Sequence, residues 1–366
     1  MLVPFRPEHD VAAPVDGVGV RSGGRLGRLV RFAGQLAVPD GKIGWMPVAA
    51  RRGRRLAREF PIRCCLSVSP RPTSHLVARR IAGSLGIPWV ADFALPWSDA
   101  PWLAGRPRFA GWLDGHVERS VVRSARHITV AYPDIGRGLC TRHGGEWERK
   151  ISVVPTGFAD DLFSQPRLPV RPKFTVVYPG NHFCEDGRHG ERFLQAVDEW
   201  IGATPEVGDR VEFVFIGERH GALARRRATM AHPEVIRVEP FMSHRACVQA
   251  IVGADLCVVN TVGHRIPDKV YECMRAGRPI LALTDPGSDL EVLVRQYSGA
   301  VAVPPRDVRG IRDALHQAWQ EGEGNHPELG SPDPSVEPYS SRRSAEVVAG
   351  ILDRLVEARR GPQGSV

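Results

Sequence analysis

Short apolar runs alternate with amphipathic helical patterns through the second half of the chain. The runs are rich in valine, isoleucine, leucine and phenylalanine and are bounded by turn or charged residues, which predicts buried strands. These strands are expected at 174–178, 211–216, 235–238, 256–259, 280–283 and 300–303. Helical patterns fill the gaps at 191–201, 219–230, 244–252, 268–276, 290–295 and 308–319. This alternation specifies an α/β fold in which helices cover both faces of a parallel sheet.

The first half of the chain repeats the alternation with less regular spacing. Strands are expected at 62–67, 89–93, 127–130 and 151–154, and helices at 26–37, 47–59, 74–85 and 109–124. At 366 residues the chain is too long for one typical domain and fits two of roughly 150 residues each. We therefore predict an α/β protein with two Rossmann-like domains.

Proline-rich and glycine-rich segments mark the domain boundaries. We predict an N-terminal domain over 1–157, a linker over 158–172 and a second domain over 173–330. Residues 321–337 break the alternation, and a last helix at 339–360 is expected to pack back toward the N-terminal domain. Ligands of open α/β sheets bind beyond the carboxyl ends of the strands, so we expect the two domains to face a central cleft that holds the site.

Cysteine usage and the absence of a targeting pattern bear on the compartment. The chain has seven cysteines, none in a C-x-x-C pair, and several lie inside apolar runs. This favours buried structural thiols in a reducing cytoplasm, and no Cys/His cluster has the spacing of a zinc site, so no metal is expected. The sequence contains no apolar run of about 18 residues and no signal-peptide pattern at its start. We predict a cytoplasmic protein.

The net charge of +8 is concentrated near the N-terminus. Between residues 21 and 58, ten basic residues accompany Asp40 and Glu59 follows directly. This region fits a phosphate-bearing acceptor or an anionic membrane, for instance the inner face of the plasma membrane, and a solvated arginine surface is an equal alternative. Nucleic acid is not expected as a partner, since neither interleaved aromatic residues nor a reader motif accompanies the arginines.

The most informative segment is 254–282, ADLCVVNTVGHRIPDKVYECMRAGRPILA. A buried strand ends at Asn260, a polar loop follows, and Pro267 is expected in the first turn of a helix that carries Lys269 and Glu272. The N-terminus of a helix offers free N–H groups to a diphosphate. A carboxylate one turn later, at Glu272, can accept hydrogen bonds from both hydroxyls of a ribose.

The run I-P-D-K-V-Y-E-C-M-R-A-G-R-P-I-L-A resembles the donor-site signature of retaining GT-B glycosyltransferases, family 4-like, a large group with bacterial polysaccharide and natural-product members. Three further segments, LSVSPRPTSHLVARRIAGSLGIPWVADF, VVPTGFADDLF and VVYPGNHFCEDGRHGERFLQAV, resemble other parts of the same family. The resemblance covers about residues 25–320. It implies a GT-B fold and a hexosyltransferase that uses a UDP-, GDP- or dTDP-sugar as substrate, without a cofactor or metal.

Carried over by position, the resemblance assigns the donor site. The donor-binding residues it implies are Gly180, Arg188, Val238, Pro240, His264, Pro267, Lys269 and Glu272. Glu272 would bind the ribose hydroxyls, and Arg188 would offset the charge that builds on the departing diphosphate. His264 stands where the family usually has a glutamate that contacts the transferred sugar, which leaves the identity of the sugar open.

The acceptor side departs from the family pattern. The usual D-F-R-D-P-W is replaced here by D-F-A-L-P-W at 92–97, with Ala94 in place of the arginine. His75, Asp92 and Trp97 are the acceptor-side candidates, and Asp92 joins Arg188 and Glu272 as a candidate catalytic residue. The family's first strand and its glycine-rich loop would precede Met1, so the N-terminal domain is expected to lack its usual first strand.

We predict transfer of a sugar to a hydroxyl acceptor with retention and without a metal, the acceptor being a lipid-linked or natural-product glycan intermediate. One alternative is a catalytically impaired homologue that binds nucleotide and assists a partner protein. Another is a GT-B epimerase acting on a nucleotide sugar, for which the segment 66–97 supplies no obvious set of acid and base residues.

Overall fold

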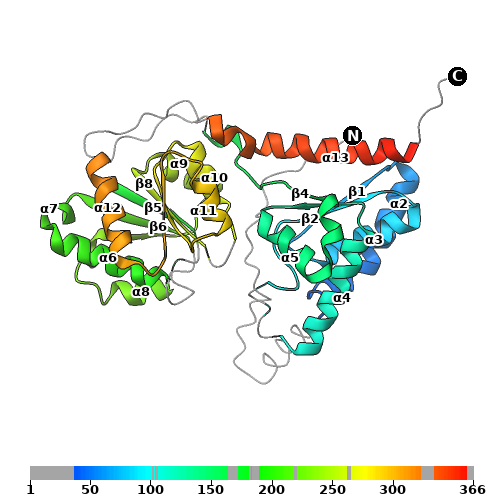
Figure 1. The fold of residues 1–366 in the computed structure, drawn as a ribbon, viewed down its shortest axis with the longest axis horizontal. Coiled ribbons are helices and arrows are strands. Elements are labelled where there is room, and N and C mark those ends of the chain that lie inside the picture. Colours follow the sequence, from blue (N-terminus) through cyan, green and yellow to red (C-terminus); the bar gives the residue numbers. More distant parts are fainter. Residues whose placement is uncertain are drawn as a thin grey trace. The chain divides into compact units, whose positions relative to one another are not determined.

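The computed structural model describes residues 37–100, 103, 106–163, 172–180, 183, 189–217, 221–261, 265–322 and 334–360. The chain divides into two units (Figure 1). The first consists of Met1–Thr129, Gly138–Ile151 and Leu355–Val366, and the second of Val130–Arg137 and Ser152–Arg354. Within the described residues, no helix is long and apolar enough to cross a bilayer.

The first unit is built around a four-stranded sheet. Its strands β1 (Cys65–Val68), β2 (Trp89–Phe93), β3 (His127–Val130) and β4 (Ile151–Val153) lie in the order β1-β2-β3-β4, and β1 pairs in parallel with β2. Its helices are η1 (Ile43–Trp45), α2 (Met46–Glu59), α3 (Thr73–Leu85), α4 (Arg108–Ser124), α5 (Pro133–His143) and η3 (Gly145–Lys150). The α5 helix was not predicted from the sequence, because its proline and two glycines lower helix propensity and hide the apolar pattern.

The second unit contains a six-stranded sheet whose printed pairs are all parallel. The strands are β5 (Phe174–Pro179), β6 (Val211–Ile216), β7 (Ile236–Glu239), β8 (Leu256–Asn260), β9 (Ile280–Leu283) and β10 (Ala300–Val303). Their order is β10-β9-β8-β5-β6-β7, which is the doubly wound arrangement of a Rossmann domain. The order reverses between β5 and β8, and that point is where ligands of such sheets bind.

Helices connect these strands and fill the gaps that the sequence pattern indicates. They are η4 (Asp160–Phe163), α6 (His189–Ala203), α7 (Pro205–Gly208), α8 (Gly221–Arg227), η5 (Pro233–Val235), α9 (His244–Val252), α10 (Lys269–Arg275), α11 (Asp289–Val294), α12 (Val308–Gly322), η6 (Pro334–Tyr339) and α13 (Ser341–Arg360). The predicted helix at 26–37 lies outside the described residues, so that prediction stays open.

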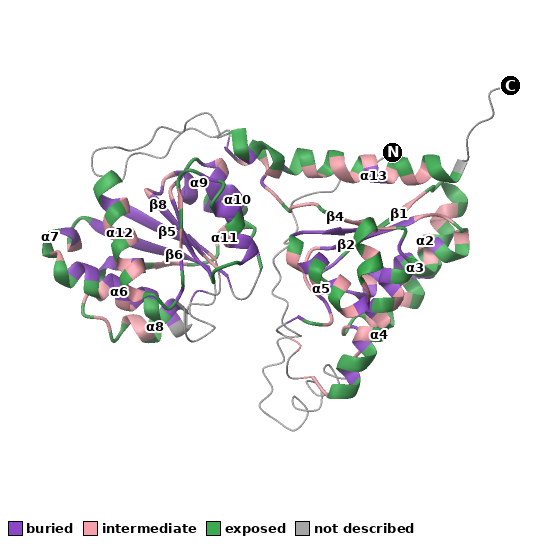
Figure 2. Ribbon diagram, viewed as in Figure 1, coloured by how far each residue is buried: buried purple, intermediate pink, exposed green. Residues whose placement is uncertain are grey.

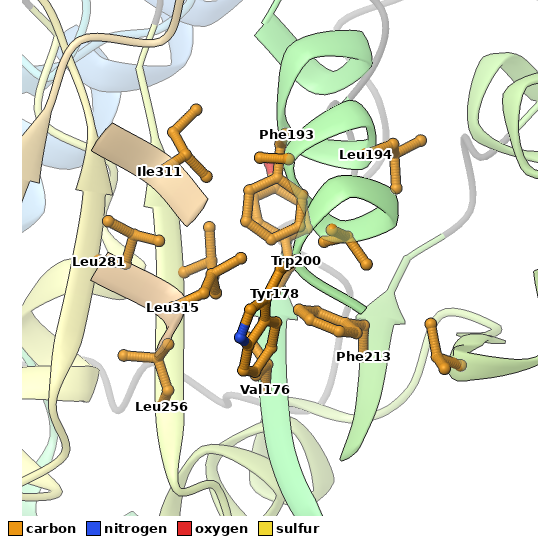
Figure 3. Close-up of a cluster of buried hydrophobic side chains, with 14 of the residues drawn as sticks. Val176, Tyr178, Phe193, Leu194, Trp200, Phe213, Leu256, Leu281, Ile311 and Leu315 are labelled. Atoms are coloured by element: carbon orange, nitrogen blue, oxygen red, sulfur yellow. The ribbon is translucent and has the colours of Figure 1, made fainter. Parts of the chain in front are cut away.

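The core of the second unit is aromatic. Phe193 and Trp200 on α6 meet Phe213 on β6 edge to face, with ring centroids 5.9 and 6.4 Å from Phe213 (Figure 3). Leu315 and Ile311 of α12 belong to the same buried cluster. Rings of this size each bury roughly 150–250 Å² and supply much of the energy of a core. Figure 2 shows the buried residues concentrated on the strands and on the helix faces that cover them.

The segment after β4 is tied to the start of α13. Phe158 forms an isolated parallel bridge with Ser340, and the Ser341 hydroxyl donates to the Phe158 carbonyl at 2.7 Å. The α13 helix continues beyond residue 354, so that its last part is assigned to the first unit. Three expectations stay predictions: the packing of this helix against the N-terminal domain, the limits of the linker, and the absence of a first strand.

Candidate functional site

Glu272 is a buried carboxylate held between two basic side chains. It lies one turn into α10 and is 4% exposed. Lys269, three residues earlier on the same helix, donates from Nζ to Oε2 at 2.8 Å and to Oε1 at 3.1 Å. His244, at the start of α9, places Nε2 2.5 Å from Oε1. The structure therefore brings together two predicted site residues and one that the sequence did not indicate.

The surroundings keep Glu272 ionised. Burial by itself would raise the pKa of Glu272, but the hydrogen bond from His244 and the charge of Lys269 outweigh it, and the pKa lies below its ordinary value. An ionised carboxylate only accepts hydrogen bonds, so Nε2 of His244 must carry a proton. His244 is itself exposed, which makes its ring the side chain that separates the carboxylate from solvent. The result is a buried negative charge whose two oxygens are held by Lys269 and His244.

Three cysteines lie close to this carboxylate in the interior. Cys257 on β8 and Cys273 on α10 are fully buried and hydrogen-bonded to each other, and Cys247 on α9 is also buried. Burial raises the pKa of Cys273, and it raises that of Cys247 to about 11. The raised pKa values keep the thiols of Cys247 and Cys273 neutral, so they act as small apolar side chains near Glu272.

The start of α10 differs from the sequence prediction. Pro267 was expected in the first turn, but the helix begins at Lys269 with Asp268 as its N-cap residue, and Pro267 lies one residue earlier. The carbonyl of Pro267 accepts the Val270 N–H at 3.1 Å. The Asp268 side chain does not cap the helix, and its carboxylate accepts the Thr156 hydroxyl at 2.9 Å. This contact ties the turn after β4 to the site.

The ends of β5 and β8 flank the topological switch point. The Tyr178 hydroxyl of β5 donates to Asn260 Oδ1 of β8 at 2.8 Å, which fixes both strand ends. Gly180 follows directly, and a Cβ at this position would come within 2.8 Å of the Tyr178 hydroxyl oxygen. A side chain at position 180 would therefore require the Tyr178 ring to shift.

The other predicted donor residues are less tightly placed. Val238 is half-buried on β7, the edge strand two positions from β5, and Pro240 is exposed directly after it. Glu239 between them accepts the Gly217 N–H through its backbone carbonyl at 3.1 Å. Arg188 and His264 lie outside the described residues, so their predicted roles stay predictions.

Two of the acceptor-side candidates are enclosed. His75 is 0% exposed and stacks on Phe93 with ring centroids 4.8 Å apart, while its Nδ1 lies 2.8 Å from the Ser67 hydroxyl oxygen. Burial lowers the pKa of His75 to about 4, so the ring is neutral, and its Nε2 has no partner among the described residues. Trp97 is 3% exposed and donates its indole N–H to Asp114. An acceptor could contact either ring only after its neighbours moved.

Asp92 is the second-to-last residue of β2 and is half-buried. Its carboxylate accepts the Thr129 hydroxyl at 2.5 Å, and burial raises its pKa above the ordinary value in spite of that hydrogen bond. The backbone around it is fixed by Ser69, whose N–H donates to the Asp92 carbonyl and whose hydroxyl accepts the Ala94 N–H. Of the acceptor-side candidates, Asp92 is the one whose carboxylate retains some exposure.

A buried charged network anchors the acceptor-side loop, and sequence reasoning missed it. Glu118 on α4 is 0% exposed and accepts hydrogen bonds from the Ser98 N–H and hydroxyl, from Arg142 and from His143. One turn earlier, Asp114 pairs with Arg106 at the other end of the loop. Burial alone would raise the pKa of Glu118, but these donors outweigh it and the pKa is lowered. The sequence pattern that could have indicated this network is a pair of acids four residues apart on an otherwise apolar face of the helix.

The sequence of the second unit and the fold of the chain are similar to those of known proteins. Residues 174–321 match the family model described as glycosyl transferases group 1. Sucrose-phosphate synthase from Thermosynechococcus elongatus is similar in structure, with a TM-score of 0.63 and 15% identity over 87% of this chain and 80% of that chain. For α,α-trehalose 6-phosphate synthase from Burkholderia multivorans the TM-score is 0.64 and the identity 13%, over 93% of this chain and 81% of that one.

A putative UDP-N-acetylglucosamine 2-epimerase from Listeria monocytogenes is also similar, with a TM-score of 0.55 and 12% identity over 85% of this chain and 80% of that one. No curated protein sequence matched the chain. The fold class predicted from the sequence is confirmed: the chain has two Rossmann-like domains of the GT-B type. The resemblance to GT-B glycosyltransferases is confirmed as well, and the matching segment covers the six-stranded sheet together with α10, the helix that carries Glu272.

Proposed function

We propose that this protein is a glycosyltransferase that binds a nucleotide-sugar donor through its second unit and transfers the sugar to a hydroxyl acceptor with retention. The match of residues 174–321 to a glycosyltransferase family model supports the reaction class. The doubly wound order of the sheet supports the location, since nucleotides bind beyond the switch point of such sheets. We further propose that the donor is a UDP-, GDP- or dTDP-sugar and that the acceptor is a lipid-linked or natural-product glycan.

The observation that carries the proposal is the ionised, buried carboxylate of Glu272. A buried charge is costly and persists only where partners hold it. Lys269 and His244 do so here at short distances. A carboxylate held in a fixed orientation can accept hydrogen bonds from the two adjacent hydroxyls of a ribose, which nucleotide binding requires.

The hydrogen-bonding capacity of the carboxylate gives this proposal a specific form. Each carboxylate oxygen can accept about two hydrogen bonds. Oε2 receives one, from Lys269, whereas Oε1 already receives one from Lys269 and one from His244. In the proposed complex the exposed His244 ring turns away and uncovers the carboxylate, so that one ribose hydroxyl binds Oε2 and the other binds Oε1. Donor binding would thus exchange a histidine contact for a ribose contact.

The proposed donor position also indicates which residues would stabilise the negative charge on the departing diphosphate. In the proposed mechanism Arg188 offsets the charge on the leaving diphosphate, so that no metal or cofactor is required. Lys269 holds Glu272 in the described structure and would contribute a second positive charge nearby. The acceptor hydroxyl would attack the face from which the nucleotide leaves, with Asp92 as the proposed acceptor-side carboxylate.

A second candidate is a homologue that binds nucleotide without transferring sugar and supports a partner protein. The enclosure of His75 and Trp97 favours it, because in this conformation the imidazole of His75 is not accessible as an acid or base and the ring of Trp97 is not accessible to an acceptor. Asp92 is the acceptor-side candidate that remains, and it is hydrogen-bonded to Thr129.

Turnover of donor separates the two candidates. A thermal-shift screen with UDP, GDP, dTDP and their sugars first identifies the nucleotide, since a ligand of the native state raises its melting temperature. Release of the nucleoside diphosphate from the best sugar donor is then followed chromatographically. Slow donor hydrolysis, or transfer to an added acceptor, that disappears in Glu272→Ala supports the proposal. A melting shift without any turnover favours the non-catalytic homologue, and no shift with any nucleotide contradicts both.

A further inference from the structure

The helix α2 presents a strongly basic surface bordered by exposed apolar side chains. Trp45 just before the helix is 57% exposed and Val48 in its first turn is 67% exposed. Beyond its end, Phe60 is 53% exposed and Ile62 is 37% exposed. Figure 2 shows α2 as mostly exposed. Exposed large apolar residues thus lie at both ends of this surface helix, next to its arginines.

The inner side of α2 packs against α3, so the opposite side of the helix is its exposed face. Ala50 is fully buried, and Gly53 approaches Ile81 of α3 so closely that a Cβ at position 53 would come 2.3 Å from Ile81 Cδ1. Glycine at this position lets the two helices pack at short distance. The arginines Arg51, Arg52, Arg54, Arg55 and Arg58 are all exposed.

Charge is concentrated on this surface. Residues 42–63 contain seven basic side chains and one acid, a net charge of +6, against +8 for the whole chain. Among the described residues, the ion pair found on α2 is Arg55 with Glu59, whose side chains are 71% and 49% exposed. Asp40, the nearest other acid, accepts hydrogen bonds from the N–H and hydroxyl of Thr73. The positive charge of the surface is therefore largely uncompensated.

We propose that the outer face of α2, together with Trp45, Val48, Phe60 and Ile62, docks onto a bilayer that contains anionic lipids. The arginines complement the negative surface potential, and tryptophan and aliphatic side chains favour the boundary between headgroups and acyl chains. A nucleic-acid backbone would complement the charge but leave Val48 and Ile62 without a role. Because the apolar inner face of α2 packs on α3, the apolar contribution is limited to the residues at the helix ends, and the attachment is reversible and weakened by salt. This inference stands apart from the proposed role of Glu272.

Vesicle cosedimentation of the full chain tests the proposal. Phosphatidylcholine vesicles are compared with vesicles in which phosphatidylglycerol replaces part of the phosphatidylcholine, at low and high salt. The wild type should bind the anionic vesicles and be released by salt. Each basic residue near such a surface contributes about 1 kcal/mol, so the triple variant R51Q/R52Q/R55Q should bind roughly 100-fold more weakly. A second variant, W45S/V48S, should lower binding while keeping the charge.

A matched control removes the same charge elsewhere. Arg225, Arg306 and Arg342 are exposed on other parts of the chain, and R225Q/R306Q/R342Q should retain most of the binding. Circular dichroism melting checks that all variants fold. If both triple variants lost vesicle binding equally, binding would depend on net charge alone, and the proposal would be overturned. Absence of wild-type binding to either vesicle would also overturn it, and would indicate that a protein segment covers α2. Tighter binding to duplex DNA than to anionic vesicles, lost in R51Q/R52Q/R55Q, would assign the surface to nucleic acid instead.

Discussion

Replacing Glu272 by glutamine tests whether its carboxylate receives the ribose of a nucleotide. The side chain is buried and ionised, and one oxygen retains capacity for a further hydrogen bond. Hydrogen bonds to charged groups contribute about 1.5–3 kcal/mol each, and those to neutral groups about half as much. For two ribose hydroxyls, Glu272→Gln should therefore cost about 2–3 kcal/mol, which is roughly a 30- to 150-fold weaker Kd.

The informative measurement combines this substitution with a change in the ligand. Isothermal titration calorimetry compares UDP with 2′-deoxy-UDP, and GDP with 2′-deoxy-GDP, on both proteins. The wild type should prefer the ribonucleotide by about 10- to 100-fold, the value of one hydrogen bond to a charged group. In Glu272→Gln this preference should shrink to a few-fold, whereas the exposed Glu199→Gln should keep it.

Loss of affinity alone would not support the assignment, because the substitution also leaves Lys269 without its buried anion. That structural effect would weaken both nucleotides equally. If Glu272→Gln bound more weakly but preferred the ribonucleotide as strongly as the wild type, the placement of Glu272 on the ribose would be wrong.

Three other substitutions test the remaining arguments. His244→Ala should leave nucleotide affinity unchanged or raise it severalfold in calorimetry, because the ring occupies Oε1 in the absence of ligand; a loss of tenfold or more would show that His244 contacts the nucleotide itself. Glu118→Gln should destabilise the first unit by about 3–5 kcal/mol at neutral pH, since it leaves buried donors facing an amide. Because the pKa of Glu118 is lowered from 4.5, the stabilisation is present above that pH and is lost as pH falls through the folded-state pKa, so the melting difference from wild type should narrow in acid. Burial lowers the pKa of His75 from 6.5 to about 4, so the unfolded chain takes up the proton first as the pH drops. The free energy of unfolding should therefore fall by about 3 kcal/mol across that pH interval. Denaturant unfolding of His75→Phe between pH 7 and pH 4 should lack this component, and an unchanged pH slope would contradict the buried, neutral state of the ring.

Much of the α/β framework was predictable because it rests on local periodicity. The strand limits 89–93 and 127–130 agree with β2 and β3, and most others agree within a few residues. Errors occur where proline or glycine decides the local conformation. Pro267 was expected in the first turn of its helix but precedes the N-cap residue Asp268, and the helix of 133–143 was missed.

The sequence alone determined the alternating framework and marked Lys269 and Glu272, because two residues three positions apart share one side of a helix. Only the tertiary structure decided their surroundings. His244 reaches Glu272 across 28 positions of sequence, and His143 reaches Glu118 across 25. Such pairs depend on how helices pack around a sheet, which local patterns do not encode. The burial of His75 has the same origin: the sequence places it at the start of a helix directly after a polar loop, and only the tertiary structure shows that Ser67 and the Phe93 ring enclose it.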